Sequence, residues 1–227
     1  MSPGTFITFE GGEGAGKSTQ ARLLAARLDA LGHDVVVTRE PGGTPFAEQV
    51  RALLLSPSTA PHGAMAEALM FYAARADHLD KVIRPALAAG KFVICDRFSD
   101  STSVYQSHAR AGDADGLDRA TFDMLERAVV ATTRPSLTIV VDIDPAVGRA
   151  RAASRRSEAA GGVGSQADAY ERREIEFHDT LRRGFLAIAE AEPQRCVVVD
   201  GSLAEAAVAD AVWSAVSDRL AAHLGKD

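Results

Sequence analysis

The sequence predicts an α/β fold in which five parallel strands form one sheet and helices cover both of its faces. Two observations support this prediction. Five short runs are almost entirely apolar and rich in β-branched residues, and longer segments with helical spacing of apolar residues separate them. Strands that are apolar on both faces meet no water, which is the environment of a parallel sheet buried between two helical layers.

The predicted elements alternate along the chain. Strands are expected at residues 5–9, 34–38, 91–96, 136–143 and 195–200. Helices are expected from residue 18 onward and at 45–55, 64–89, 101–109 and 116–131. Two further helices carry apolar residues at helical spacing, namely Phe177, Leu181, Phe185 and Ile188 in one, and Val208, Val212, Val216 and Leu220 in the other.

One stretch departs from this alternation. Residues 152–167 include three glycines and few apolar side chains, so no packed core can form there. We therefore expect a mobile lid at the end of a helix, over about residues 149–168.

Composition and charge limit the possible functions. The chain has 227 residues, of which 46% are hydrophobic and 25% charged, so a single domain over residues 1–227 is expected. The net charge of −6 argues against a protein that coats nucleic acid or an anionic membrane. Cys95 and Cys196 lie in apolar runs and predict buried free thiols, which fits a cytoplasmic protein. No signal peptide or membrane-spanning run is recognisable, so we expect no membrane partner.

The most specific motif is a glycine-rich loop between the first predicted strand and the first predicted helix. It matches the pattern G-x-x-x-x-G-K-S/T, in which backbone N–H groups surround phosphate oxygens. Lys17 would reach the β- and γ-phosphates and the hydroxyl of Ser18 would bind Mg²⁺, while the helix adds its positive N-terminal end. A three-layer P-loop NTPase fold that binds a nucleoside triphosphate is therefore predicted. The binding residues expected are Gly11, Gly12, Glu13, Gly14, Ala15, Gly16, Lys17, Ser18 and Thr19.

Two aspartates compete for the position beside the metal ion. Asp96 ends the strand at 91–96 and precedes Arg97, and Asp142 lies near the end of the strand at 136–143. Ligands gather beyond the carboxyl ends of parallel strands, so either carboxylate could meet Mg²⁺ and Arg97 could meet a phosphate. Composition leaves this choice open. A GTPase switch is disfavoured, because its base-reading Asn-Lys-x-Asp motif needs asparagine and the chain contains none.

Six segments resemble bacterial thymidylate kinases, within the nucleoside monophosphate kinase group. They are FITFEGGEGAGKSTQ (6–20), TREPGGT (38–44), LMFYAARADH (69–78), DRFSDSTSVYQ (96–106), VDIDP (141–145) and YERREIEFH (170–178). They follow the order found in the family and cover most of the chain. The resemblance implies transfer of the γ-phosphoryl group of ATP to dTMP, giving ADP and dTDP for dTTP synthesis, with Mg²⁺ as cofactor. It also implies a homodimer.

The resemblance further implies roles for single residues. Phe71 and Arg75, four apart on one helical face, look like the pair that stacks on thymine and donates to its O4 atom. Arg97 resembles the arginine that holds the acceptor's phosphate, a role that suits a planar bidentate donor. Tyr105 resembles the residue whose ring crowds the sugar C2′ atom and disfavours ribonucleotides.

Other positions follow from the same resemblance. Thr102 and Gln106 lie where residues near the edge of the base are expected. Glu13 occupies the position of a carboxylate close to the acceptor's sugar and phosphate. The resemblance also favours Asp96 over Asp142 as the carboxylate beside the metal ion.

The resemblance is weakest in the lid. Family members with an acidic residue in the P-loop usually supply catalytic arginines from the lid, often in an Asp-Arg pair before an aromatic-Glu pair. Here the string is Asp168-Ala169-Tyr170-Glu171, so that arginine is missing. Asp168 and Tyr170 stay candidate substrate-binding residues. The candidate replacements for the missing arginine are Arg151, Arg155 and Arg156.

This interpretation needs no general base. The second pKa of a phosphate monoester is near 6, so the acceptor oxygen is already largely anionic at neutral pH. Catalysis then consists of positioning and charge neutralisation by Lys17, Arg97, Mg²⁺ and lid arginines. Two alternatives stay open, namely a deoxynucleoside kinase, which needs a carboxylate base beside an unphosphorylated sugar, and a nucleotide-binding module without turnover.

Overall fold

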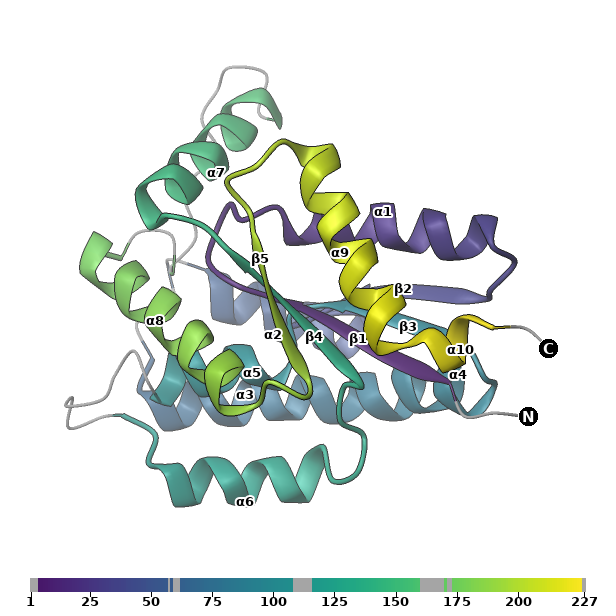
Figure 1. Ribbon diagram of the computed structural model, residues 1–227. Coiled ribbons are helices and arrows are strands. Elements are labelled where there is room, and N and C mark those ends of the chain that lie inside the picture. The colour runs from purple at the N-terminus through teal and green to yellow at the C-terminus, as the bar shows by residue number, and fades with distance from the viewer. Residues whose placement is uncertain are drawn as a thin grey trace.

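A single parallel sheet forms the centre of the computed structural model (Figure 1), in which residues 4–56, 58, 62–107, 116–159, 170 and 173–225 are described. Its strands are β1 (Thr5–Glu10), β2 (Val35–Arg39), β3 (Phe92–Asp96), β4 (Leu137–Asp142) and β5 (Cys196–Asp200). They lie in the order β2-β3-β1-β4-β5, and every neighbouring pair is parallel. The five predicted strands are confirmed, with ends within one residue of those expected.

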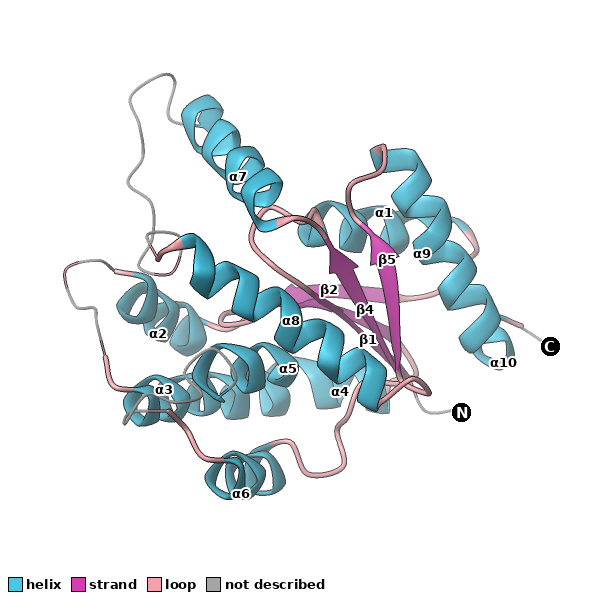
Figure 2. Cartoon of the chain, turned by 60° about the vertical axis from the view of Figure 1, so that its left-hand side comes forward, coloured by secondary structure: helices cyan, strands magenta, loops and turns pink. Residues whose placement is uncertain are grey.

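Helices cover both faces of this sheet. They are α1 (Lys17–Ala30), α2 (Pro45–Leu55), α3 (Ala64–His78), α4 (Arg84–Ala88), α5 (Ser99–Thr102), α6 (Arg119–Val129), α7 (Pro145–Ala159), α8 (Ile175–Ala191), α9 (Glu205–Arg219) and α10 (Ala221–Leu224). Helices α1 and α9 pack on one face, while α3, α4, α5 and α8 lie against the other (Figures 1 and 2). The predicted α/β architecture with two helical layers is confirmed.

Side chains within each strand alternate between the two helical layers. In β1, Ile7 and Phe9 enter the core beneath α1 and α9, whereas Phe6 enters the core beneath α3. In β3, Ile94 points to the first of these cores and Val93 to the second. Because side chains in a strand alternate with a period of two and both faces are covered, almost every position of the central strands β1, β3 and β4 is buried. This explains why the strands are near-continuous apolar runs in the sequence.

The long predicted helix at 64–89 is present but not uniform. It consists of α3, a π-helical turn called η1 (Leu79–Ile83), and α4. Pro85 has no N–H to donate to the carbonyl oxygen of Lys81, and the wider turn ends two residues before this proline. The sequence interpretation placed one regular helix here and missed this local change.

Two other predicted helices differ at their ends. The helix expected at 101–109 begins earlier, as α5. It continues as a second π-helical turn called η2 (Ser103–Ser107). Residues 108 and 109 lie outside the described part of the chain.

The helix expected at 116–131 is shorter, because Asp118 is the N-cap of α6. Its Oδ1 atom accepts the backbone N–H of Thr121 at 3.0 Å, which satisfies a donor that the first turn leaves unpaired.

The stretch at 152–167, where we expect no packed structure, is helical in its first half. Residues 152–159 continue α7, and Ala152 is buried. The segment before the first glycine consists mainly of alanine, arginine, serine and glutamate, and most of these favour a helix. The glycines begin only at residue 161, and residues 160–169 lie outside the described part of the chain. Among the described residues, no helix combines the length and the apolar character needed to span a bilayer.

Helix α1 allows a direct test of the core between the sheet, α1 and α9. Leu24 is 3% exposed and packs in this core, whereas its neighbour Leu23 is 38% exposed. We expect Leu24→Ala to lower the free energy of unfolding by about 2–5 kcal/mol, because it removes buried methyl groups and leaves a cavity. Leu23→Ala should cost less than about 1 kcal/mol. Urea unfolding followed by circular dichroism measures both losses, and equal losses would contradict the burial of Leu24 in this core.

Candidate active site

The glycine-rich loop joins β1 to α1 at the carboxyl edge of the sheet. Gly14 and Gly16 have positive φ angles of 69° and 97°, a region that side-chain-bearing residues rarely adopt. A Cβ atom on Gly14 would lie 1.9 Å from the carbonyl oxygen of Gly148 in α7, and a Cβ atom on Gly148 would lie 2.3 Å from the carbonyl oxygen of Glu13. The loop and the first turn of α7 are therefore in direct backbone contact.

Lys17 folds back over this loop. Its Nζ atom donates to the carbonyl oxygen of Gly12 at 2.6 Å, and the side chain is 7% exposed. Burial, and then repulsion from Arg97, lower the pKa of Lys17 to about 8, although nearby carboxylates oppose this shift. A buried cation in this position is suited to pairing with an anionic group.

The loop forms one wall of a polar pocket. Many of the predicted site residues line it, and five of the lining side chains are cationic, which suits a polyphosphate. Of the predicted loop residues, Gly11, Gly12 and Thr19 do not line it. The lining comprises Glu13, Gly14, Ala15, Gly16, Lys17, Ser18, Arg39, Glu40, Arg51, Asp96, Arg97 and Arg155.

The two candidate metal-side aspartates have different partners. Asp96, at the end of β3, accepts a short hydrogen bond from the hydroxyl of Ser18. Asp142, at the end of β4, is held by Arg182 in α8 through two hydrogen bonds of 2.7 Å each. A carboxylate in a bidentate pair with arginine is not free to face the loop. The geometry therefore favours Asp96 over Asp142.

Arg97 occupies the turn that follows β3. Its φ angle is 69°, an unusual value for a residue with a side chain. Its Nη2 atom donates to Glu13 Oε1 at 2.6 Å, and its Nη1 atom donates to the carbonyl oxygen of Gly11 and to Ser101 Oγ, both at 3.1 Å. Burial alone would raise the pKa of Glu13, but Arg97 and Lys17 outweigh it and lower the pKa to about 2. Glu13 therefore stays ionised and holds Arg97 across the loop.

Glu10 supports this turn from below. The residue is fully buried, its Oε1 atom accepts the backbone N–H of Phe98 at 2.7 Å, and its Oε2 atom accepts the hydroxyl of Ser101 at 2.6 Å. Burial, and then the charge of Asp100, raise the pKa of Glu10 to about 8. Sequence interpretation did not select Glu10 as a site residue, although it directly precedes the glycine-rich loop.

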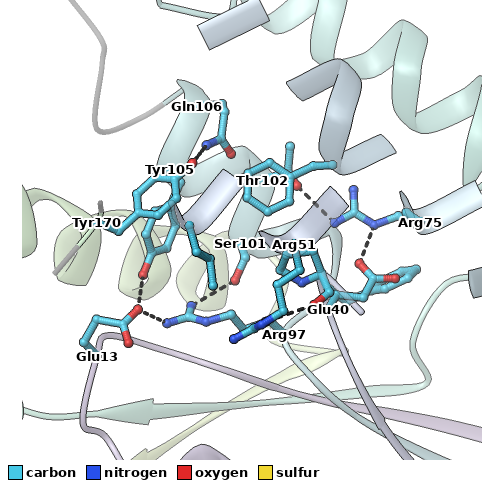
Figure 3. Close-up of a pocket in the computed structure, with 14 residues that line it drawn as sticks. Glu13, Glu40, Arg51, Arg75, Arg97, Ser101, Thr102, Tyr105, Gln106 and Tyr170 are labelled. Atoms are coloured by element: carbon cyan, nitrogen blue, oxygen red, sulfur yellow. Dashed lines mark hydrogen bonds and ion pairs between the residues drawn. The ribbon is translucent and has the colours of Figure 1, made fainter. Parts of the chain in front are cut away.

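A second pocket adjoins the first and is more apolar (Figure 3). Four side chains, Glu13, Glu40, Arg51 and Arg97, line both pockets. The second pocket brings together eight residues that the sequence interpretation named, which come from the P-loop, α3, the turn after β3, α5, η2 and the segment before α8. They are Glu13, Phe71, Arg75, Arg97, Thr102, Tyr105, Gln106 and Tyr170.

Arg75 points into this second pocket from α3. It is 1% exposed, its Nε atom donates to Glu40 Oε2 at 2.8 Å, and its Nη2 atom donates to Thr102 Oγ1 at 3.0 Å. Glu40 is held in turn by His78, whose Nδ1 atom lies 3.1 Å from Glu40 Oε1. The Nη1 atom of Arg75 is buried and has no hydrogen-bond partner among the described residues. A buried donor without a partner is costly unless a ligand accepts from it.

An acceptor in the same pocket is also unpaired. Gln106 is 0% exposed, its Nε2 atom donates to Glu67, and its Oε1 atom is buried without a partner in the described part of the chain. Tyr105 closes one side, since its hydroxyl donates to Glu13 Oε1 at 3.0 Å and its ring meets that of Tyr170 edge-on with the centroids 5.4 Å apart. Among the described residues, Arg75 and Gln106 thus give this pocket a buried donor and a buried acceptor that lack protein partners.

The three candidate lid arginines lie on α7 but have different surroundings. Arg155 lines the polar pocket beside the loop. Arg151 instead donates from Nη1 to the carbonyl oxygen of Gly201 at 2.8 Å. Arg156 does not line either pocket. Asp168 lies outside the described residues.

Comparison with known proteins identifies the family. A family model described as thymidylate kinase matches residues 9–212 of this chain. The chain belongs to the thymidylate kinase family. A thymidylate kinase from Caulobacter vibrioides is 48% identical over 225 residues, which cover 99% of this chain and 100% of that protein. A thymidylate kinase from Afipia carboxidovorans is 47% identical over 221 residues, which cover 97% of this chain and 92% of that protein.

The fold agrees with a solved member of the thymidylate kinase family. A crystal structure of thymidylate kinase from Ehrlichia chaffeensis matches with a TM-score of 0.71 and 34% sequence identity, over 95% of this chain and 99% of that one. The match confirms the P-loop NTPase fold that the glycine-rich motif predicts.

The pockets of this thymidylate kinase family member also contain residues that sequence interpretation missed. Arg51 in α2 lines both pockets and donates from Nη1 to the carbonyl oxygen of Pro41 at 2.9 Å. Arg39 and Glu40 belong to the segment TREPGGT, which carried part of the family resemblance. Taking site residues from that segment, and from the helix that follows it, would have found all three.

The buried carboxyl of Glu10 predicts a pH-dependent stability. Its pKa is raised from 4.5 to about 8 in the folded state, so the folded chain binds a proton more tightly than the unfolded chain, and stability falls as pH rises through this window. Glu10→Gln removes this titration. Relative to the parent protein, the variant should therefore gain stability as pH rises from about 5 to about 8. Urea unfolding at several pH values measures the difference in free energy of unfolding between the variant and the parent protein. A difference that stays constant with pH would contradict the raised pKa of Glu10.

Proposed function

We propose that this chain transfers the γ-phosphoryl group of ATP to dTMP, giving ADP and dTDP and so supplying dTTP synthesis. The observation that carries this proposal is a pair of buried atoms in the second pocket that have no hydrogen-bond partner among the described residues. Arg75 Nη1 is a buried donor and Gln106 Oε1 is a buried acceptor. Thymine presents an acceptor at O4 and a donor at N3, so it can pair with both atoms, whereas cytosine presents the opposite pattern.

The arrangement of the two pockets supports transfer between two bound nucleotides. We assign ATP to the pocket beside the glycine-rich loop and dTMP to the pocket beside Arg75. Because both pockets share Arg97 and Arg51, the acceptor's phosphate would lie between these guanidinium groups and face the donor's γ-phosphate. Glu13 fixes the position of Arg97 before either substrate binds.

The residues near the loop also fit a magnesium ion. Ser18 and Asp96 bring a hydroxyl and a carboxylate oxygen together, and Mg²⁺ in nucleotide sites is held by a few such oxygens and by the phosphates. We propose Ser18 and Asp96 as the residues that hold it. When bound, Mg²⁺ neutralises charge on the phosphate oxygens.

Protein groups would supply the remaining steps. Lys17 pairs with the phosphates of ATP, and Arg97 and Arg51 hold the acceptor in line. The acceptor oxygen is already largely anionic at neutral pH, so no side chain has to remove a proton. Phe71 would stack on the base, Thr102 steadies Arg75, and Tyr105, fixed by Glu13, would lie against the sugar and disfavour a 2′-hydroxyl.

We also propose that the whole chain, residues 1–227, is one kinase domain, and that it acts in the cytoplasm as a homodimer. The first and last strands, β1 and β5, belong to the same sheet, which supports one domain. Exposed apolar side chains on α2, α3 and α6 support an interface between copies. They are Phe46, Leu53, Met65, Leu69 and Met124. The net charge of −6 supports nucleotides rather than nucleic acid as partners.

A coupled ADP-release assay tests the reaction. With ATP and Mg²⁺, we expect turnover of dTMP to exceed that of dCMP by at least about 100-fold in kcat/KM, because dCMP leaves the polar groups of the pocket unpaired. Thymidine should not be an acceptor. Lys17→Ala should remove turnover with dTMP while the protein still unfolds cooperatively. Turnover of thymidine in place of dTMP would show a deoxynucleoside kinase instead.

The lid arginine can be identified by comparing two neighbours on α7. We propose Arg155 for this role, because it lines the pocket beside the loop and Arg156 does not. Arg155→Ala should lower kcat on the order of 10³-fold, since such an arginine stabilises the charge of the transferring phosphoryl group. Arg156→Ala should change kcat by about twofold at most. Equal effects of both variants on kcat would remove the assignment.

A further inference from the structure

A buried carboxylate lies behind the second pocket, called the base pocket below. It contacts the residue that would form a hydrogen bond with the base. Glu67 in α3 is 3% exposed and does not line the pocket. It precedes Phe71 by one helical turn and Arg75 by two, so the three residues share one face of α3. Glu67 therefore acts on the pocket through another side chain.

That side chain is Gln106. Its Nε2 atom donates to Glu67 Oε2 at 3.1 Å, and the hydroxyl of Tyr170 donates to the same oxygen at 3.0 Å. Gln106 is 0% exposed and Tyr170 is 6% exposed, so water does not compete for these bonds. The amide nitrogen also lies 3.4 Å from the Tyr170 hydroxyl, as the dashed line in Figure 3 indicates.

The carboxylate selects one of the two orientations of the Gln106 amide. An amide presents a donor at one end and an acceptor at the other, whereas a carboxylate only accepts. Rotating the amide by half a turn would place its oxygen against Glu67, with no hydrogen between two acceptors, and would leave the amide N–H groups without this partner. In the orientation that Glu67 favours, Oε1 is the end left without a protein partner in the described part of the chain.

We propose that Glu67 is a specificity-determining positioning residue of the base pocket. By holding the Gln106 amide in one orientation, it makes the pocket accept a pyrimidine with N–H at ring position 3 and reject one with a lone pair there. The proposal rests on the function proposed above, in which thymine occupies this pocket. Cytosine has an acceptor at ring position 3, and only the rotated amide could donate to it.

A double-mutant cycle tests this proposal. Glu67→Met keeps the length of the side chain and removes both acceptor oxygens, and Gln106→Met removes the group that contacts the base. With the parent protein, Glu67→Met, Gln106→Met and the double variant, kcat/KM is measured for dTMP and for dCMP. We expect Glu67→Met to lower the ratio of kcat/KM for dTMP to kcat/KM for dCMP roughly tenfold, mainly through KM. When Glu67→Met is added to Gln106→Met, we expect little further loss in this ratio.

A matched control separates positioning from stability. Glu126 in α6 is a second buried carboxylate that accepts a tyrosine hydroxyl, from Tyr72 at 2.8 Å, and it lines neither pocket. Glu126→Met should destabilise the protein and leave the ratio of dTMP to dCMP unchanged. If Glu67→Met does not fold, Glu67→Gln is used instead. The introduced amide can form a hydrogen bond with the Gln106 amide in either orientation of Gln106. We then expect the ratio of kcat/KM for dTMP to kcat/KM for dCMP to fall by at least about threefold.

The outcomes are distinct. Two results would overturn the role of Glu67. One is a folded Glu67 variant in which the ratio of kcat/KM for dTMP to kcat/KM for dCMP is unchanged. The other is a double variant in which the losses in this ratio caused by Glu67→Met and by Gln106→Met simply multiply. A parent protein that does not phosphorylate dTMP would instead overturn the proposed function, whatever the variants do. A lower ratio together with non-additive losses supports the proposal.

Discussion

The parallel pairing of β1 with β3 is the constraint on which the site depends. Phe9 lies opposite Asp96 in this pairing, and the backbone N–H of Arg97 donates to the carbonyl oxygen of Phe9 at 2.9 Å. Because both strands end at the same level, the glycine-rich loop and the turn that carries Asp96 and Arg97 leave the sheet side by side. Residues more than 80 positions apart in the chain, such as Glu13 and Arg97, meet for this reason.

Buried charges in the site are held in pairs, and one of these pairs leaves a donor unused. Glu13 orients Arg97, and Glu40 orients Arg75, whose Nη1 atom has no partner in the described part of the chain. Burying a donor without a partner lowers the free energy of unfolding, because the donor loses its hydrogen bonds to water and gains none in the protein. The benefit is a donor already in position when a ligand arrives, so little reorganisation accompanies binding. The left-handed turn at Arg97 adds backbone strain to the same region.

Local patterns in the sequence predict much of this structure, and long-range pairs account for most of what they miss. The strands and the glycine-rich loop follow from apolar runs and from a motif with a known mechanism. The pairs Glu40 with Arg75 and Glu67 with Gln106 join residues more than 30 positions apart, so no local pattern contains them. Arg51 was missed because arginine is abundant in this chain and only the fold shows which arginines line a pocket.

The contact between Gly14 and Gly148 links the shape of the glycine-rich loop to a residue 134 positions further along the chain. Gly148 belongs to the first turn of α7, and neither glycine has room for a methyl group against the other's segment. The two positions therefore share one limit on size, and a larger residue at either would push the loop and the first turn of α7 apart. The first turn of α7 thus holds the loop in one shape, so the loop's conformational entropy is lost during folding rather than during nucleotide binding.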